Sequence, residues 1–287
     1  MQSNILIAGY GVFGAGLVDH IESNHKNIKI VKIIEPNRHK RDILLKRGYK
    51  TCESPHELSS HDAHEAKVVI DCSPRGEGSK NKPIYSNIGL RAIFQNGEED
   101  RSIGALYYPG STNINKHEHF LMPLCSGISV LKVLSALKKN KMSLPYKILG
   151  THSKVSNTSR MLMPNNPNAN SQILELFGVN ARMDIVYLRG EPYQNKFTYY
   201  GSVQLQYKEK APSRKDFINS IAEHPWIDII SDKSDLLTNL SIKDKTAIVK
   251  ESFYSDGKTI SFMGLSSTPD VNYPIVIQAV LDIYSMR

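Results

Sequence analysis

Short apolar runs alternate with segments of helical spacing along the first hundred residues of the chain. The run at 4–8 is followed by a segment at 12–22 whose apolar side chains share one helix face. Continuous apolar runs of this length are typical of strands buried on both faces of a parallel sheet. The pattern predicts an α/β fold on a doubly wound, Rossmann-type parallel sheet. Strands are predicted at 4–8, 28–34, 67–71 and 91–95, and helices at 12–22 and 81–87.

The second half of the chain mixes strands and helices in a less regular order. A strand-like run at 120–124 precedes a segment at 128–139 with helical spacing. Ser213 with Asp216 three residues later is a helix-start signal. This mixture predicts an α+β domain. Further strands are predicted at 147–151, 184–189, 196–207, 247–253 and 259–266, the last two joined by a turn at Asp256-Gly257, and helices at 213–224 and 273–286.

A glycine-rich segment joins the first predicted strand to the first helix. Its sequence, Gly9-Tyr10-Gly11-Val12-Phe13-Gly14, fits the dinucleotide-binding pattern G-x-G-x-x-G. In that pattern the first glycine permits a tight turn, the second lets the backbone approach a pyrophosphate, and the third allows close helix packing. The helix that begins at Val12 and Phe13 offers free N–H groups to phosphates. A glycine turn without a ligand is the alternative.

An acidic residue ends the second predicted strand. Glu35 lies 21 residues after Gly14, where a carboxylate can accept the hydroxyls of an adenosine ribose. A carboxylate there repels a 2′-phosphate, so NAD is favoured over NADP. The neighbouring Asn37, Arg38 and Lys40 leave NADP open, because a basic cluster could hold a 2′-phosphate.

Two later strands also end in polar loops. In a doubly wound sheet the loops after the carboxyl ends of the strands face the cofactor. We therefore expect Ser73 and Pro74, and Gln95 and Asn96, to contact it. Cys72 lies inside a strand end and is interpreted as a packed thiol rather than a reactive one.

Composition and charge narrow the class of protein. Apolar residues make up 40% of the chain and charged residues 22%, which is ordinary for a globular enzyme. The net charge of +8 comes from basic residues spread in short clusters without an arginine-rich arm, so we expect anionic small molecules and no nucleic acid as partners. No apolar run is long enough to span a membrane, and the N-terminus lacks a basic signal-peptide segment.

The cysteines and histidines exclude some kinds of site. The three cysteines favour a reducing, cytoplasmic location and exclude a disulfide framework or a four-thiolate metal site. His56, His61 and His64 lack supporting ligands in order, so no metal site is expected. Cys52 receives no role.

Two sequence elements make the chain resemble a known family. Asp71-Cys72-Ser73-Pro74-Arg75-Gly76-Glu77-Gly78-Ser79-Lys80-Asn81-Lys82 and Arg91-Ala92-Ile93-Phe94-Gln95-Asn96-Gly97-Glu98, with the opening glycine motif, resemble archaeal-type (type II) glyceraldehyde-3-phosphate dehydrogenase. The resemblance implies an oxidoreductase with a cofactor domain at 1–124, a catalytic α+β domain at 125–270 and a C-terminal helix at 271–287 that packs back on the first. It also implies a homo-oligomer, a dimer or tetramer.

Cys125 stands between a predicted strand and a predicted helix. A helix N-terminus there stabilises a thiolate through its dipole and free N–H groups. In the resembled family the nucleophilic cysteine lies at this junction, and Cys125 is its positional match. The resemblance implies attack on an aldehyde, hydride transfer to a nicotinamide, and release of a thioester to phosphate or water. We expect the cysteine at the seam of the two domains. A buried, inert thiol is the alternative.

The chain departs from the family around this cysteine. The family's Asn-Thr-Thr is replaced by Ser126-Gly127-Ile128. Ser126 and Gly127 are expected to contact the substrate. The segments that match the family's histidine-bearing elements, 164–167 and 197–202, contain no histidine. The substrate site is therefore expected to be altered.

Another histidine has to serve as the general base in this interpretation. A base near a hydride-transfer centre needs a pKa near the working pH, which favours histidine. His152, at the end of the strand predicted at 147–151, is the candidate, with His117 and His119 as second choices. Arg160, in a loop predicted at 153–164, would bind an anionic group of the substrate.

The leading hypothesis is an NAD(P)-dependent aldehyde or acyl-phosphate oxidoreductase that uses Cys125. One alternative is a dehydrogenase of the same fold without a covalent step. The other is a degenerate nucleotide-binding or sensor protein, which the missing histidine favours.

Overall fold

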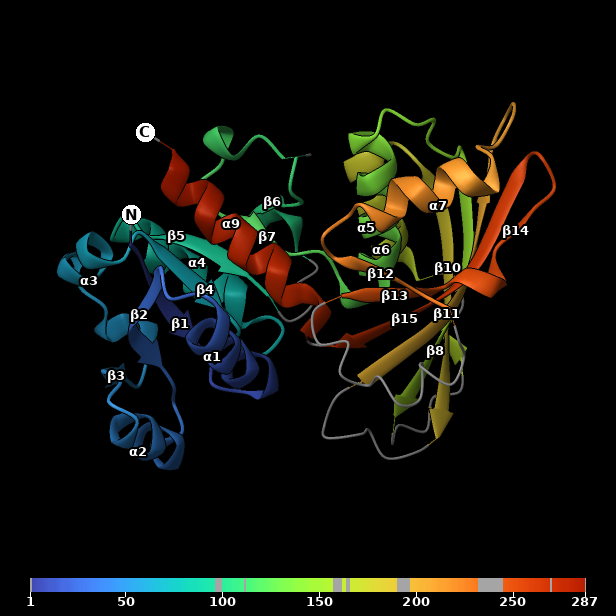
Figure 1. Cartoon of the computed structure of the whole chain (residues 1–287). Helices are drawn as coiled ribbons and strands as arrows, with labels where there is room; N and C mark the ends of the chain where they lie inside the picture. Colours follow the sequence, from blue (N-terminus) through green and yellow to red (C-terminus); the bar gives the residue numbers. More distant parts are fainter. Residues whose placement is uncertain are drawn as a thin grey trace. The chain divides into compact units, whose positions relative to one another are not determined.

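The computed structural model of the chain describes residues 2–95, 100–110, 112–156, 162–163, 166–189, 197–231, 245–268 and 270–286. The chain forms two compact units (Figure 1). Unit 1 consists of residues 1–122 and 275–287, and unit 2 of residues 123–274. Arg160 and Asn96, both predicted site residues, lie outside the described residues.

Unit 1 is built on a seven-stranded sheet in which every paired strand is parallel. Its order is β3-β2-β1-β4-β5-β7-β6. Strands β2 and β3 are thus added on one side of β1, and the later strands on the other side, beginning with β4. This confirms the predicted doubly wound, Rossmann-type sheet. The strands are β1 Ser3–Ala8, β2 Ile28–Ile34, β3 Thr51–Cys52, β4 Val68–Asp71, β5 Arg91–Phe94, β6 Ala105–Leu106 and β7 Phe120–Leu121.

Helices flank this sheet, and some of them escape the sequence pattern. Leu44 is the buried residue of helix α2, so its spacing carries little hydrophobic signal. Helix α4 begins at Glu77, earlier than the predicted start at 81. The earlier start was not predicted because Gly78 and Pro83 lower the helical propensity of that segment. The helices are α1 Val12–Asn24, α2 Arg38–Lys46, α3 Ser60–Glu65, α4 Glu77–Asn87 and α9 Tyr273–Ser285, with short 3₁₀ turns at Pro55–Glu57, Arg101–Ile103 and Ile114–Lys116.

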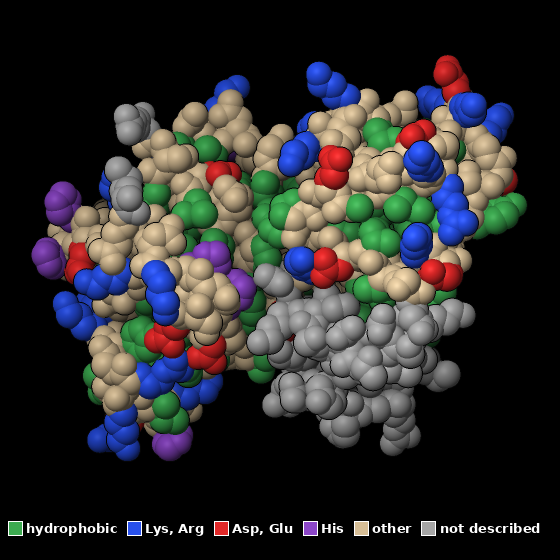
Figure 2. Space-filling view, in the orientation of Figure 1, with side chains coloured by type: hydrophobic (Ala, Val, Ile, Leu, Met, Phe, Trp, Pro, Cys, Tyr) green, Lys and Arg blue, Asp and Glu red, His purple; other side chains and the backbone are tan. Residues whose placement is uncertain are grey.

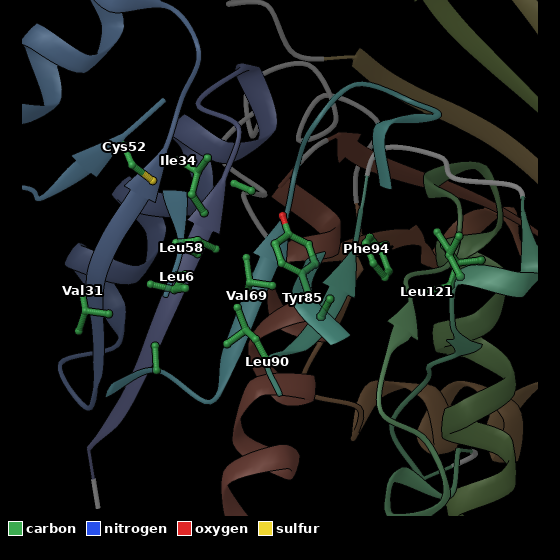
Figure 3. Packing of buried hydrophobic residues seen from close by; sticks show 14 residues of the cluster. Leu6, Val31, Ile34, Cys52, Leu58, Val69, Tyr85, Leu90, Phe94 and Leu121 are labelled. Atoms are coloured by element: carbon green, nitrogen blue, oxygen red, sulfur yellow. The ribbon is translucent and has the colours of Figure 1, made fainter. Parts of the chain in front are cut away.

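The core of unit 1 lies between the sheet and its helices. Figure 3 shows Tyr85 from α4 packed near Val69, Leu90 and Phe94. The ring of Tyr85 is fully buried. Buried apolar side chains on both sides of the central strands explain why their sequences are continuous apolar runs rather than alternating ones.

The C-terminal helix α9 is attached to unit 1 by polar contacts as well as by apolar packing. The hydroxyl of Tyr107 donates to Asp282 at 2.6 Å. The backbone N–H of Lys67 donates to the hydroxyl of Tyr284, which itself donates to the carbonyl of Asn4. Residues from both ends of the chain therefore build one unit.

Unit 2 contains a mixed sheet in the order β12-β13-β15-β11-β8-β10-β9, with β14 paired to β15. Strands β14 and β15 form the hairpin predicted at Asp256-Gly257. The mixed sheet and its helices agree with the predicted α+β architecture. The strands are β8 Lys147–Ser156, β9 Leu162–Met163, β10 Asn180–Arg189, β11 Phe197–Gln206, β12 Ile227–Ile230, β13 Thr246–Val249, β14 Tyr254–Ser255 and β15 Thr259–Thr268.

Some predicted elements of unit 2 were wrong in their bounds. The loop predicted at 153–164 begins as strand, because β8 continues to Ser156 in register with β10. The strand predicted at 247–253 ends at Val249 and gives way to a 3₁₀ turn at Lys250–Ser252. The helices are α5 Cys125–Lys139, α6 Pro167–Phe177, which the sequence pattern missed, and α7 Arg214–Ala222, with a 3₁₀ turn at Asp270–Asn272.

Candidate functional site

A cavity of about 710 Å³ opens at the carboxyl ends of β1, β2, β3 and β4 in unit 1. This is the edge at which doubly wound sheets bind ligands. Its walls come from the glycine segment, the end of β2, the segment after β3 and the start of α4. They include the predicted residues Gly9, Gly11, Glu35, Ser73 and Pro74, and further residues such as Tyr10, Lys40, Ser54, His56, Lys80 and Asn81.

The three glycines of the motif have different local surroundings. Gly9 has a φ of +87°, and a Cβ there would lie 2.8 Å from the carbonyl oxygen of Cys72. A Cβ at Gly14 would lie 2.0 Å from the carbonyl oxygen of Gly9, so the helix approaches the glycine segment more closely than a larger side chain would allow. A Cβ at Gly11 would meet nothing within 4 Å. The space in front of the α1 N-terminus is therefore open, as a phosphate site requires.

The two residues after Gly11 do not line the cavity with their side chains. Val12 is 61% exposed and is the first residue of α1. Phe13 is buried in the core. Any contribution of these positions to ligand binding therefore comes from the backbone N–H groups of the first helical turn.

Glu35 is held in place by the backbone around it. Its side chain is buried, with an exposed fraction of 4%. One carboxylate oxygen accepts the N–H of Tyr10 at 2.7 Å and the other accepts the N–H of Asn37 at 2.9 Å. A carboxylate oxygen has more than one acceptor direction, so both remain able to accept further hydrogen bonds.

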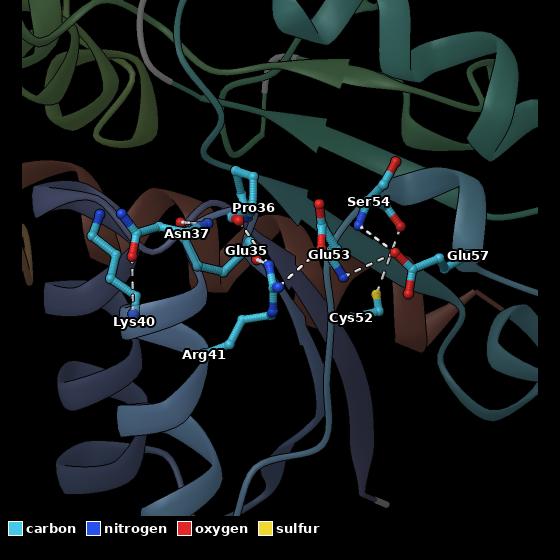
Figure 4. Close-up of polar contacts among 9 residues, drawn as sticks. All are labelled: Glu35, Pro36, Asn37, Lys40, Arg41, Cys52, Glu53, Ser54 and Glu57. Carbon is cyan, nitrogen blue, oxygen red and sulfur yellow. Dashed lines mark hydrogen bonds and ion pairs between the residues drawn. The ribbon is translucent and has the colours of Figure 1, made fainter.

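Basic side chains surround Glu35 without pairing directly with its carboxylate (Figure 4). The ammonium group of Lys40 donates to the carbonyl of Tyr10 at 3.0 Å and lines the cavity. The guanidinium of Arg41 donates to the carbonyl of Glu35 and to Glu53, at 2.8 and 2.9 Å. Of the basic cluster after β2, Lys40 is therefore the member that faces the cavity, whereas Arg38 is exposed outside it.

Sequence reasoning missed the wall that follows β3. Ser54 and His56 line the cavity from a 3₁₀ turn capped by Ser54 and Glu57. Strand β3 has only two residues, Thr51 and Cys52, which is too short to produce a hydrophobic pattern. The Ser54 to Glu57 capping pair is the sequence signal that could have marked this turn.

Gln95 lies at the end of β5 but does not line the cavity. Its side chain is buried, and its Oε1 atom has no hydrogen-bond partner among the described residues. Its backbone N–H donates to the carbonyl of Asp71 at 2.8 Å. A buried acceptor without a partner is costly, so this atom is a candidate for a ligand contact.

Cys52 and Cys72 are buried thiols in unit 1. Burial raises the pKa of Cys52 to about 11. Burial, with the negative charge of Asp71, raises the pKa of Cys72 well above its usual value. Neither sulfur is in the reactive thiolate form at neutral pH, which agrees with the interpretation of Cys72 as a packed side chain.

Cys125 is the first residue of helix α5 in unit 2. Its side chain is partly exposed, whereas Ser126 and Gly127 are buried. The N-terminus of α5 is fixed by two amide side chains. Gln172 accepts the N–H of Leu124 at 2.8 Å, and Asn166 donates to the Ser126 hydroxyl at 3.0 Å. The helix thus begins three residues before the predicted start at 128 and places the thiol in its first turn.

His152 lies on β8 against the N-terminus of α5. The side chain is 3% exposed. Burial lowers its pKa to about 4, and a hydrogen bond with the Ser126 backbone acts in the opposite direction. On the adjacent strand β11, Gly201 leaves the room for its ring, since a Cβ there would lie 2.1 Å from Cδ2 of His152. The pKa lies below the near-neutral value on which the choice of His152 rested.

The second-choice histidines belong to unit 1. His119 is buried, accepts the N–H of Ala92 at 3.1 Å and pairs with the Ser86 hydroxyl at 2.7 Å. Burial lowers its pKa. His117 is exposed and stands with His119 beside a separate hollow of about 420 Å³. Neither lines the cavity at the glycine segment.

The described residues also bear on other kinds of site. On the face shown in Figure 2, Lys and Arg side chains are dispersed among acidic and apolar ones. Within the described residues, no group of three or more His, Cys, Asp or Glu side chains could hold a metal ion. No helix of the described part of the chain is long and apolar enough to cross a membrane.

Comparison with known proteins gives partial matches to one enzyme. No model of a known protein family matches the chain. A glyceraldehyde-3-phosphate dehydrogenase of Methanobacterium bryantii is 34% identical over 131 residues, which are 40% of this chain and 38% of that protein. The enzyme of Methanothermus fervidus is 31% identical over 116 residues, 35% of this chain and 34% of that protein. Glyceraldehyde-3-phosphate dehydrogenase 2 of Methanosarcina barkeri is 29% identical over 112 residues, 34% of this chain and 32% of that protein.

The matched segments span about a third of the length of these curated relatives. The similarity to these glyceraldehyde-3-phosphate dehydrogenases therefore covers only part of the chain, whose first unit is built on a Rossmann-type sheet.

Proposed function

We propose that the chain is an NAD(P)-dependent oxidoreductase that acts on an aldehyde or an acyl phosphate through Cys125. The observation that carries the proposal is the cavity at the carboxyl edge of the parallel sheet, where an open helix N-terminus and the Glu35 carboxylate lie on one wall. The similarity to archaeal glyceraldehyde-3-phosphate dehydrogenases over a third of the chain supports the same activity class.

The residues of the cavity fit a nicotinamide dinucleotide. The glycine segment and the first N–H groups of α1 would hold the pyrophosphate, and Glu35 would accept hydroxyls of the adenosine ribose. Ser73 and Pro74 would line the other side of the ligand. Gln95 does not line this cavity; its buried Oε1, which has no hydrogen-bond partner among the described residues, is proposed to accept from the cofactor. Asn96 is proposed beside Gln95.

NAD is the proposed cofactor, with NADP as the alternative. A 2′-phosphate on the ribose would have to lie beside the buried Glu35 carboxylate, and two like charges there repel each other. Lys40 is the cation that could compensate, but its ammonium group already donates to the carbonyl of Tyr10. That hydrogen bond uses one of the three N–H groups of the ammonium, so Lys40 keeps donors for a 2′-phosphate and NADP stays the alternative.

The proposed chemistry begins at the Cys125 sulfur. Its attack on an aldehyde carbon forms an S–C bond, and the former carbonyl oxygen takes up a proton to give a thiohemiacetal. A bound nicotinamide supplies the acceptor for the hydride that leaves this carbon. Loss of the hydroxyl proton leaves a thioester, and attack by phosphate or water releases the acyl group and restores the thiol. The reverse direction reduces an acyl phosphate to an aldehyde.

Residues around α5 are proposed to support these steps. The first helical turn favours the thiolate of Cys125, since its N–H groups and dipole stabilise negative charge. His152 is proposed as the proton acceptor; its ring is neutral at pH 7, but a pKa of about 4 makes it a weaker base there than an ordinary histidine. Ser126, Gly127 and Arg160 are proposed to contact the substrate, with Arg160 taking an anionic group. The enzyme is proposed to be a cytoplasmic homo-oligomer.

A nucleotide-binding protein without turnover is the second candidate. One observation favours it: His152 and Ser126, both assigned to the reaction, are only 3% and 4% exposed. A third candidate is a dehydrogenase that lacks the covalent step. The experiment that follows distinguishes both of these candidates from the leading proposal.

The experiment tests for an acyl group on Cys125. The full-length protein is mixed with NAD and a panel of aldehydes, and the acid-quenched protein is analysed by peptide mass spectrometry. The proposal expects an acyl mass on the Cys125 peptide, formation of reduced nicotinamide, and loss of both in Cys125→Ala. Cys52→Ala, which removes a buried thiol elsewhere, should keep both. Full activity of Cys125→Ser would exclude the covalent mechanism, and binding of NAD without turnover would favour the second candidate.

A further inference from the structure

A second hollow opens in unit 1, at the other edge of the parallel sheet from the cofactor cavity. It has a volume of about 420 Å³, and its walls are residues 101–105, residues 116–119 and Lys82 of helix α4. Strands β6 and β7 begin at Ala105 and Phe120, so the hollow lies at their amino ends. The cofactor cavity lies at carboxyl ends of the same sheet, and of the described residues none lines both.

Basic side chains dominate the walls of this second hollow, which we call the basic hollow. Lys82, Arg101 and Lys116 bring three positive charges, against one negative charge from Glu118. The cofactor cavity is instead lined by two lysines and three glutamates. Among the described residues, no ion pair joins Lys82 or Lys116 to a carboxylate. Like charges gathered in one hollow repel each other, and an anion that enters it relieves that repulsion.

His119 lines the basic hollow as a buried, neutral side chain. Its ring is 5% exposed, Nδ1 accepts the N–H of Ala92 at 3.1 Å, and Nε2 bonds to the Ser86 hydroxyl at 2.7 Å. Burial lowers the pKa of His119, and the positive charge of Lys82 acts in the same direction. The positive charge of the hollow at neutral pH therefore comes from the lysines and the arginine rather than from this ring.

The walls of the basic hollow are fixed by contacts within unit 1. The ammonium group of Lys82 donates to the carbonyl of Ser102, which ties α4 to the 3₁₀ turn at 101–103. Asp100 caps that turn by accepting the N–H of Ser102 at 2.8 Å, and it does not itself line the hollow. A Cβ at Gly104 would lie 2.9 Å from the backbone of His119, so the two backbone walls lie against each other.

The chemistry of these walls selects one class of ligand. Ammonium and guanidinium groups make charge-assisted hydrogen bonds to phosphate oxygens, and arginine can do so with two N–H groups at once. Ser102, Gly104 and Ala105 present small side chains, which leave their backbone accessible from the hollow. The volume lies within the range of small-molecule sites, about 300–1,000 Å³.

We propose that the basic hollow is a second ligand site, which binds a phosphate group, either free or carried by a small molecule. The proposal depends neither on the cofactor nor on Cys125. Because the hollow and the cofactor cavity lie at opposite edges of one sheet, a dinucleotide in the cavity should not compete with phosphate in the hollow.

The test is an equilibrium titration of the full-length chain with two probes, inorganic phosphate and glycerol 3-phosphate, at constant ionic strength and with and without NAD. Arg101→Gln and Lys116→Gln each remove one charge from an exposed side chain, so both variants should fold as the wild type does. We expect each substitution to weaken binding of both probes by about three- to tenfold, and the double variant to bind more weakly than either. Tighter binding of glycerol 3-phosphate would identify a phosphorylated small molecule as the ligand, and equal binding would identify free phosphate.

Two other lysines of unit 1 provide the matched control. Lys46 and Lys50 are exposed and line neither the basic hollow nor the cofactor cavity. The pair Lys46→Gln and Lys50→Gln changes the net charge of the chain as much as the double variant does, and should leave the affinity for both probes nearly unchanged. Lys82 is left in place in every variant, because it also supports the carbonyl of Ser102.

The outcomes separate this inference from the proposed function. The inference is overturned if the wild type shows no saturable phosphate binding, or if the double variant binds phosphate as the wild type does. Equal losses in the control pair would also overturn it, because they would show a general effect of net charge. Competition by NAD would place the phosphate in the cofactor cavity, with the same consequence. Failure of NAD to bind at all would count against the proposed function and leave this inference standing, since the variants alone locate the phosphate.

Discussion

Glu35 is the side chain proposed to discriminate between NAD and NADP. Its carboxylate is buried and already accepts two backbone N–H groups, so it cannot turn away from an incoming ligand without breaking them. Removing its charge while keeping its shape should therefore relax the discrimination against a 2′-phosphate.

We predict that Glu35→Gln weakens NAD binding about tenfold and narrows the affinity gap between NAD and NADP, because a charged acceptor is worth more than a neutral one. Titration of both dinucleotides measures the ratio. Glu53→Gln is the control, since Glu53 also lines the cavity but is exposed and paired with Arg41. An unchanged ratio in Glu35→Gln would show that Glu35 does not face the ribose.

The burial of His152 leads to a second prediction, on how stability depends on pH. Its pKa is about 4 in the folded chain and 6.5 in the unfolded chain, so the unfolded state binds the proton more readily. The stabilising effect of the neutral ring is complete above pH 6.5 and is lost as the pH falls toward 4. Between pH 7 and pH 5 the free energy of unfolding should fall by about 2 kcal/mol from this group.

Urea unfolding of the wild type and of His152→Leu at both pH values measures the difference. The variant should lose less stability on acidification than the wild type, whatever its stability at pH 7. Equal losses in the two proteins would mean that His152 is not held in a neutral, buried state. His224, whose pKa burial also lowers to about 4, accounts for part of the remaining slope.

At the scale of elements, the pairing of β8 with β11 decides where the imidazole lies. Gly201 is opposite His152 in that pairing, and a Cβ there would also lie 2.8 Å from the Nε2 atom of the ring. We predict that Gly201→Ala displaces His152 and destabilises unit 2 by about 1–3 kcal/mol through overpacking. If His152 serves the reaction at Cys125, acylation of the thiol should slow as well.

The cross-strand partner of Gly201 supplies the control for this prediction. Gly264 on β15 pairs with Gly201, and a Cβ there would come no closer than 3.4 Å to the carbonyl of Ala247. Gly264→Ala should therefore leave the melting temperature and the thiol chemistry almost unchanged. Similar effects of the two substitutions would argue that glycine is needed for strand flexibility rather than for the histidine ring.

Elements with a strong hydrophobic pattern were predictable, and those without one were not. The apolar run of β2 predicted both its bounds and the position of Glu35 at its end. The two-residue strand β3 gave no pattern, so Ser54 and His56 were missed. Lys80 and Asn81 were missed as cavity residues because α4 starts earlier than its glycine and proline content suggests. Sequence spacing also could not show that His152 is buried.

At the scale of the whole molecule, the residues that line the cavity are close together in the sequence, whereas the unit that holds them also includes residues from far along the chain. All residues that line the cavity lie between Gly9 and Ile84. Unit 1 nevertheless includes residues 275–287, and helix α9 is tied to it through Asp282 and Tyr284. A hydrophobic pattern at 273–286 predicted the helix, whereas its attachment to the first unit was implied only by the family resemblance, because that attachment depends on tertiary contacts.

We predict that a chain ending at residue 274 loses dinucleotide binding although every cavity residue is present. The buried side chains of α9, among them Ile275, Val276 and Ile283, are each worth about 1.5–3 kcal/mol, which together exceed the margin by which a typical domain is stable. Thermal melting and NAD titration of the shortened chain measure the loss, and a synthetic peptide of residues 273–287 should restore part of both. Asp282→Asn, which weakens one contact and keeps the apolar face, should lower the melting temperature only slightly. Undiminished NAD binding by the shortened chain would show that α9 is not needed to hold the sheet in its binding form.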